Sequence, residues 1–207
     1  MGINKLMTLI TEKAPKALKN IQMNELTGKV VACDASMAIY QFLIATQTLK
    51  TGFGVSELRD TKGNLTGHLV GLLHRTIQFM ENGVKPIWVF DGKPPVLKSK
   101  ELEKRKDMKK KAEEDQKEAH EDGDMELAAK MAGRSIRITD DMIKDAKDML
   151  RLMGMPVVEA PGEAEAQCAE IVKEGKAFGT ASEDMDALTF GSKILLRGFN
   201  SKKEPIV

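Results

Sequence analysis

Short apolar runs rich in β-forming residues recur along the 207-residue chain, and stretches with helical apolar spacing separate them. Runs of this length and composition are typical of strands buried on both faces of a parallel sheet. The expected strands are 29–34, 85–91, 155–160, 177–182 and 193–197. The expected helices are 6–12, 36–49, 68–81, 139–154, 162–173 and 186–190. This alternation predicts an α/β fold, a mostly parallel, doubly wound and twisted sheet with helices on both faces.

The segment from residue 97 to about residue 131 departs from this pattern. Apolar residues become sparse, and a lysine- and arginine-rich stretch is followed by one rich in Asp and Glu. Helix-forming residues fill both stretches, which is typical of a solvated, protruding helix rather than of a core. We therefore expect one domain over 1–207 that carries a charged helical insertion at 97–138.

Composition limits the function classes. Hydrophobic residues make up 42% of the chain, and the net charge is only +1, so nucleic-acid binding must rest on local basic patches. Cys33 and Cys168 lie in an expected strand and helix without CxxC spacing, which predicts buried reduced thiols in an intracellular protein. No apolar run reaches transmembrane length, so we expect no membrane association.

Four of the five expected strands end at acidic residues, and parallel strands bring their carboxyl ends to one edge of a sheet. The candidates are Asp34, Asp91, Glu163, Glu165, Asp184 and Asp186. Each acid alone has an ordinary structural explanation, as a helix cap, a turn residue or an anion in a first helical turn. Six carboxylates at one edge would repel one another or take up protons unless a cation lay among them.

The chemistry of this set favours particular cations. Oxygen ligands without His or Cys favour Mg²⁺ or Mn²⁺ over Zn²⁺, and no EF-hand spacing supports Ca²⁺ storage. Two or more carboxylates per ion suit a two-metal site that hydrolyses phosphodiesters. Lys98 and Arg105 are candidates to meet phosphates nearby, although a solvated helix face is the ordinary role of such residues. Tyr40 can stack on a base, although core packing is the default for an aromatic residue at apolar spacing.

Five stretches closely resemble the flap endonucleases, which are structure-specific 5′ nucleases. They are Gly2-Ile3, 34–43 (DASMAIYQFL), 90–95 (FDGKPP), 160–166 (APGEAEA) and 180–186 (TASEDMD). The resemblance covers the whole chain and implies a PIN-like 5′-nuclease fold in which 97–138 forms a helical arch and its cap. It implies a monomeric 5′-flap endonuclease and 5′–3′ exonuclease acting on branched DNA in replication and repair. It further implies two Mg²⁺ ions per site, with Mn²⁺ as a substitute, and a nuclear location, with the nucleolus and mitochondria as further places.

The resemblance also implies individual roles. Asp34, Asp91, Glu163 and Glu165 would serve one metal, and Asp184 and Asp186 the other. Lys98 and Arg105 would steer and stabilise the scissile phosphate as catalytic residues. The implied DNA contacts are Gly2, Tyr40, Gln47, Arg75, Lys130, Arg134 and Glu163. Gln47 stands where relatives carry an arginine, which weakens that contact.

The family pattern continues with elements that these 207 residues do not contain. They are a further metal-binding Asp in a Gly-Ser-Asp motif, a helix-hairpin-helix region that grips duplex DNA, and a motif for the sliding clamp. We therefore expect this chain to bind metal at the first site but to cleave flaps poorly. Two alternatives stay open, a module that binds DNA junctions without full catalysis and a related nuclease that cleaves RNA.

Overall fold

The computed structural model describes residues 3, 5–48, 58–63, 66–95, 103–104, 107–108, 111, 114 and 138–199. The chain divides into two compact units. The first comprises Met1–Ala38, Leu73–Lys93 and Lys147–Val207, and the second comprises Ile39–Leu72 and Pro94–Ala146. The first unit contains the five-stranded sheet and all six of the predicted acids.

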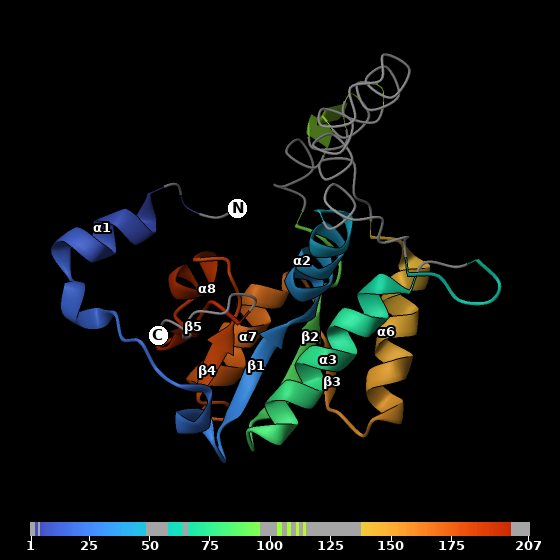
Figure 1. Cartoon of the computed structure of the whole chain (residues 1–207). Helices are drawn as coiled ribbons and strands as arrows, with labels where there is room; N and C mark the ends of the chain where they lie inside the picture. Colours follow the sequence, from blue (N-terminus) through green and yellow to red (C-terminus); the bar gives the residue numbers. More distant parts are fainter. Residues whose placement is uncertain are drawn as a thin grey trace. The chain divides into compact units, whose positions relative to one another are not determined.

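The elements follow the predicted alternation of strands and helices (Figure 1). The strands are β1 (Val30–Asp34), β2 (Lys85–Phe90), β3 (Val157–Glu159), β4 (Gly179–Ala181) and β5 (Leu195–Leu196). The α-helices are α1 (Leu6–Lys13), α2 (Ala35–Thr48), α3 (Gly67–Glu81), α6 (Asp140–Leu152), α7 (Ala164–Lys173) and α8 (Asp186–Thr189). Two 3₁₀ turns, Pro15–Ala17 and Met23–Leu26, lie between α1 and β1.

The sheet is parallel throughout, with the strand order β3-β2-β1-β4-β5. The chain builds outward from β1 in one direction through β2 and β3, and then returns to the other side of β1 for β4 and β5. The order therefore reverses between β1 and β4. In open α/β sheets, ligands bind beyond the carboxyl ends of the strands at such a reversal.

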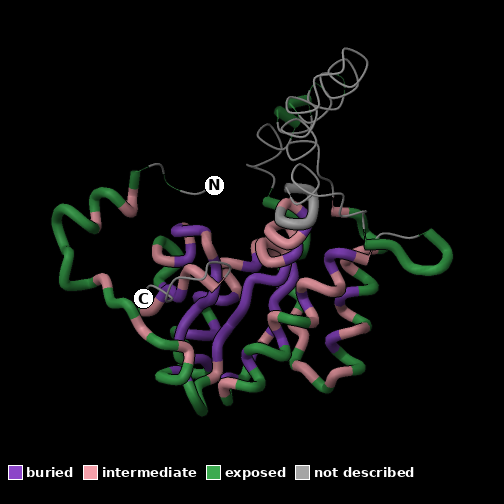
Figure 2. The backbone as a smooth tube through the Cα atoms, viewed as in Figure 1, coloured by how far each residue is buried: buried purple, intermediate pink, exposed green. Residues whose placement is uncertain are grey.

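The two faces of the sheet carry different partners, because successive side chains of a strand point to opposite faces. On one face, Val89 of β2 belongs to a buried cluster with residues of α7. On the other face, the ring of Trp88 lies 6.3 Å from that of Phe79 on α3. The ammonium group of Lys147 on α6 lies 5.4 Å from the ring centre of Phe90. β1, β2, β4 and β5 are accordingly among the most buried parts of the described chain, whereas the edge strand β3 is only half-buried or exposed (Figure 2).

The predicted fold class is confirmed, and several element boundaries are corrected. β3, β4 and β5 contain three, three and two residues, so each strand is shorter than the periodicity predicted. The helix expected from residue 162 begins at Ala164, because Glu163 has extended backbone angles (φ −82°, ψ 138°) and only precedes the first turn.

Within the predicted charged insertion, the described residues between 97 and 137 are all helical and exposed, as the composition indicated. They are Glu103, Lys104, Asp107, Met108, Lys111 and Glu114. The remainder of 97–137 lies outside the described residues, and the single-domain assignment of 1–207 stays a prediction.

The second unit contains a buried histidine in α3. His68 is 1% exposed, and neither ring nitrogen has a hydrogen-bond partner among the described residues. Burial lowers the pKa of His68, and the nearby charge of Asp145 opposes that shift only in part. The Thr139 hydroxyl accepts a hydrogen bond from the Met142 N–H at 3.2 Å, which confirms the predicted cap at the start of α6.

Cys33 and Cys168 are both buried and form no disulfide among the described residues, which fits the predicted buried thiols. Burial raises the pKa of both thiols. Among the described helices, none combines the length and the apolar character that crossing a membrane would take.

Candidate metal centre

Asp34 ends the central strand β1 and is 3% exposed. Its Oδ1 accepts a hydrogen bond from the Met37 N–H at 2.9 Å, so it caps the first turn of α2. Burial first, and then the charges of Glu165 and Asp91, raise the pKa of Asp34 to about 8, because the hydrogen bonds from Met37 and Ser182 oppose the shift only in part. Without a cation, this carboxyl group is therefore held mostly protonated at neutral pH.

Asp91 reaches the same edge of the sheet through a close backbone contact. A Cβ on Gly92 would lie 1.9 Å from the carbonyl oxygen of Ala160, so only glycine fits there. The Gly92 N–H donates to the Gly162 carbonyl at 2.7 Å. This approach brings Asp91 to the start of α7, where its Oδ1 accepts a hydrogen bond from the Ala164 N–H at 2.8 Å.

Glu163 directly precedes α7, and Glu165 lies in its first turn. Burial raises the pKa of Glu165, and the charges of Asp91, Asp184 and Glu163 raise it too. These mutual effects mean that acids from the ends of β2 and β4 and from the start of α7 lie close enough to repel one another.

The acid that ends β3 itself is not part of this group. Glu159 lies 3.1 Å from the Lys147 ammonium and 3.4 Å from the Arg151 guanidinium. Hydrogen bonding to Lys147 and its charge lower the pKa of Glu159. The acids predicted to follow β3, Glu163 and Glu165, therefore lie at the cluster, in the loop and helix after the strand. Glu159, the last residue of β3, is instead paired with Lys147 and Arg151.

Asp184 and Asp186 lie beyond β4. Asp184 is 5% exposed, and its Oδ1 accepts a hydrogen bond from the Asp186 N–H at 3.1 Å. The Oδ1 of Asp186 accepts a hydrogen bond from the Ile3 N–H at 3.1 Å. Residue 3 is thus tied to one of the predicted ligands, a contact that the sequence did not reveal.

The four aspartates share one arrangement. In each, Oδ1 accepts a backbone N–H, which fixes the carboxylate and leaves lone pairs on the second oxygen. Within the described part of the chain, none of these aspartates, nor Glu165, forms an ion pair with Lys or Arg. Anchored carboxylates without a cationic partner are the donor set that a hard divalent ion prefers.

Among the described residues, no three His, Cys, Asp or Glu side chains already form a group around one point. Mg²⁺ commonly binds through one or two carboxylates and keeps several waters. The cluster offers only oxygen donors, and among the described residues its four aspartates and Glu165 have no Lys or Arg ion-pair partner. Their chemistry therefore suits Mg²⁺.

Several predicted residues remain untested. Lys98, Arg105, Gly2, Lys130, Arg134 and the side chain of Gln47 lie outside the described residues. Tyr40 is half-buried on α2 in the second unit. Arg75 is half-buried, with its guanidinium 5.7 Å from the ring centre of Phe199, and burial lowers its pKa to about 10. Its role as a DNA contact stays a prediction.

Two polar residues next to the acids were missed. Ser182 hydrogen-bonds both to Asp34 and to the backbone of Asp184. Glu183, although acidic, accepts a hydrogen bond from the Gly198 N–H at 2.7 Å and lies 3.6 Å from Arg197. The sequence signal for Ser182 was a hydroxyl residue between a strand end and a pair of acids.

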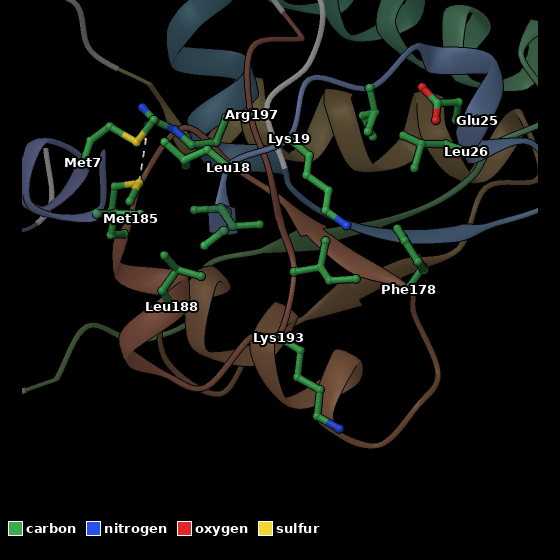
Figure 3. A pocket seen from close by; sticks show the side chains of 15 residues that line it. Met7, Leu18, Lys19, Glu25, Leu26, Phe178, Met185, Leu188, Lys193 and Arg197 are labelled. Atoms are coloured by element: carbon green, nitrogen blue, oxygen red, sulfur yellow. Dashed lines mark hydrogen bonds between the residues drawn. The ribbon is translucent and has the colours of Figure 1, made fainter. Parts of the chain in front are cut away.

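A cavity of about 530 Å³ lies elsewhere in the first unit (Figure 3). Its walls come from α1, the 3₁₀ turns, β5 and α8, and they are mostly apolar. Arg197 reaches into it and donates a hydrogen bond to the sulfur of Met185 at 3.3 Å. None of the six acids lines this cavity, so it is separate from the candidate metal centre.

Comparison with known families gives two matches. Residues 1–112 match the XPG N-terminal domain, and residues 154–206 match the XPG I-region. Together these segments include all six acids.

Similar proteins span the whole chain. Flap endonuclease 1-1 of Paramecium tetraurelia is 54% identical over 206 residues, which is 100% of this chain and 53% of that protein. Flap endonuclease 1 of Tetrahymena thermophila is 55% identical with the same coverage, 100% of this chain and 53% of that protein. The chain thus spans about half the length of the relatives it matches.

Two solved structures are also similar. Flap endonuclease-1 from Methanococcus jannaschii has a TM-score of 0.67 and 42% identity, covering 91% of this chain and 59% of that one. The catalytic core of Rad2 in complex with DNA substrate has a TM-score of 0.66 and 28% identity, covering 95% of this chain and 52% of that one.

Proposed function

We propose, on the premise that the chain belongs to the XPG family and is homologous to the flap endonucleases, that its acid cluster binds two Mg²⁺ ions and serves the hydrolysis of DNA phosphodiesters at 5′ flaps. One observation carries the proposal. Buried or half-buried carboxylates from β1, α7 and the loop after β4 lie with the exposed Asp91, which follows β2, at the reversal of strand order, and they have no Lys or Arg ion-pair partners within the described part of the chain.

The protein's own contribution is to hold the ligands still. Backbone N–H groups of Met37, Ala164 and Asp186 fix one oxygen each of Asp34, Asp91 and Asp184. When bound, a pair of divalent ions lowers the pKa of an attacking water and stabilises charge that develops at phosphorus. The buried positions of Asp34 and Asp184 strengthen their interaction with any bound cation, because water screens it less there.

Branched DNA is the proposed substrate. The names of the similar proteins and the Rad2 core bound to DNA substrate support it. Lys98 and Arg105 are proposed to contact the scissile phosphate. For the longer relatives we propose a sliding-clamp partner, and for this chain we propose action as a monomer in the nucleus. The flap endonuclease resemblance alone supports both proposals.

A cleavage assay tests the proposal. A labelled 5′-flap DNA and a plain RNA strand are incubated with the parent chain, Asp184→Ala and Glu159→Ala, in MgCl₂ and in EDTA. Glu159→Ala is the matched control, because Glu159 ends a neighbouring strand but is paired with Lys147 and Arg151.

We expect slow Mg²⁺-dependent cleavage of the flap by the parent chain and by Glu159→Ala, in keeping with the poor flap cleavage expected from the sequence. Asp184→Ala should lose most of that rate with DNA binding kept. Equal rates in Asp184→Ala, or cleavage that persists in EDTA, would refute the metal-based reaction. Binding of the junction without any cleavage would favour the binding-module alternative, and preference for the RNA strand would favour the RNA-cleaving one.

A further inference from the structure

Ser182 occupies the point where the strand order reverses. Cys33 pairs with Ala181 at the end of the parallel register of β1 and β4, and Asp34 and Ser182 are the residues that directly follow these two in the chain. Ser182 is 6% exposed. Its side chain therefore lies buried between Asp34, at the end of β1, and Asp184.

The hydroxyl of Ser182 makes two hydrogen bonds at once. It donates to Oδ2 of Asp34 at 3.3 Å and accepts from the Asp184 N–H at 3.1 Å. A hydroxyl has one proton and two lone pairs, so both bonds can form together. Since the Asp186 N–H in turn donates to Asp184 Oδ1 at 3.1 Å, one side chain links acids from β1, from the loop after β4 and from α8.

We propose that Ser182 is a positioning residue that fixes the spacing between Asp34 and Asp184 and thereby joins the two groups of metal ligands into one site. The proposal rests on the proposed function, since it assigns Ser182 a role only if the acids bind metal. Partners that orient ligands in this way commonly change metal affinity or activity about 10- to 100-fold when removed.

A buried hydroxyl can also be purely structural, and the same strand supplies the comparison. The hydroxyls of Thr180 and Ser192 lie 2.9 Å apart, and Ser192 also donates to the Ile194 carbonyl at 2.9 Å. Both residues are buried, and among the described residues neither hydroxyl hydrogen-bonds to a carboxylate. Ser192→Ala therefore removes a buried hydroxyl near β4 without touching the acids.

The experiment measures metal binding directly. MgCl₂ is titrated into the folded parent chain, Ser182→Ala, Ser182→Thr and Ser192→Ala in a calorimeter, and Mn²⁺ binding is followed by electron paramagnetic resonance. Urea midpoints in EDTA report stability without metal. If Ser182→Ala does not fold, Ser182→Cys takes its place, because a thiol fills the same space with a weaker hydrogen bond.

We expect Ser182→Ala to bind Mg²⁺ and Mn²⁺ each roughly 10- to 100-fold more weakly than the parent chain does. The metal affinity of Ser182→Thr should lie within a few-fold of the parent's affinity. Ser192→Ala should lower the urea midpoint and leave metal affinity unchanged. Unchanged affinity in Ser182→Ala, or an equal loss in Ser192→Ala, overturns the positioning role while leaving the metal-based function in place. A parent chain that binds neither ion overturns both.

Discussion

Replacing Asp34 with Asn should stabilise the metal-free protein and remove much of its stabilisation by Mg²⁺. Asparagine keeps the size of the side chain and an oxygen that can accept the Met37 N–H. It removes the charge that burial makes costly at a position only 3% exposed. The usual result of an Asp→Asn change at a helix cap would be neutral or slightly destabilising, so the direction of the effect is informative.

The magnitude follows from the shift of the Asp34 pKa from 3.8 to about 8. At about pH 7 the unfolded chain has Asp34 ionised while the folded chain binds a proton, which costs about 4 kcal/mol at 1.36 kcal/mol per pKa unit. At about pH 5 the same cost is about 2 kcal/mol. Because the folded state binds more protons than the unfolded state between these pKa values, metal-free stability falls as pH rises through this window.

Urea denaturation followed by the fluorescence of Trp88, the one tryptophan in the chain, measures these differences. Parent, Asp34→Asn and the exposed control Asp107→Asn are compared in EDTA and in MgCl₂. Asp34→Asn should exceed the parent in EDTA, by more at about pH 7 than at about pH 5. It should gain little from MgCl₂, whereas the control follows the parent. An Asp34→Asn protein that is less stable than the parent in EDTA at neutral pH would refute the reasoning.

Three further changes test other parts of the fold. Gly92→Ala should destabilise by roughly 1–3 kcal/mol and weaken Mg²⁺ binding in calorimetry, because its Cβ would meet the Ala160 carbonyl. Gly162→Ala, whose Cβ would lie 3.9 Å from any neighbour, is the control and should bind normally. The parent should lose thermal stability below about pH 6.5, since the lowered pKa of His68 keeps the folded imidazole neutral while the unfolded one takes up a proton. His68→Phe should remove this loss. Parallel profiles of melting temperature against pH for parent and variant would contradict the explanation. Phe79→Ala should cost about 3–5 kcal/mol in urea denaturation, and a cost under about 1 kcal/mol would show that its contact with Trp88 contributes little.

The sequence predicted the elements well because periodicity and capping are local properties. The run ending at Asp34 and the spacing of α3 and α6 each depend on residues within a few positions of one another. The strand order was not predictable in this way, since no local pattern states that β4 returns to pair with β1. The shortness of β5 likewise depends on pairing partners far away in the sequence.

The candidate site was predictable as a set of acids but not in its detail. Glu159 ends β3 and Asp91 directly follows β2, yet only Asp91 lies in the cluster, and Glu159 is paired with Lys147 and Arg151 of α6. The contact of Asp91 with Ala164 needs the close approach at Gly92, which joins segments about 70 residues apart in the chain. Such contacts arise from tertiary packing, which a single sequence does not specify.

The charge balance of the cluster argues for two ions rather than one. Two helices of substantial length, α2 and α7, begin at the cluster, and each helix start carries roughly half a positive charge. Together they offset about one of the six negative charges that the acids carry when fully ionised. About five remain. One divalent ion would offset about two of these charges and two ions would offset about four, and the difference matters most at Asp34 and Asp184, which are buried and where screening by water is weak. Without metal, the same excess of negative charge is reduced in another way, because Asp34, the most buried of the six acids, keeps its proton.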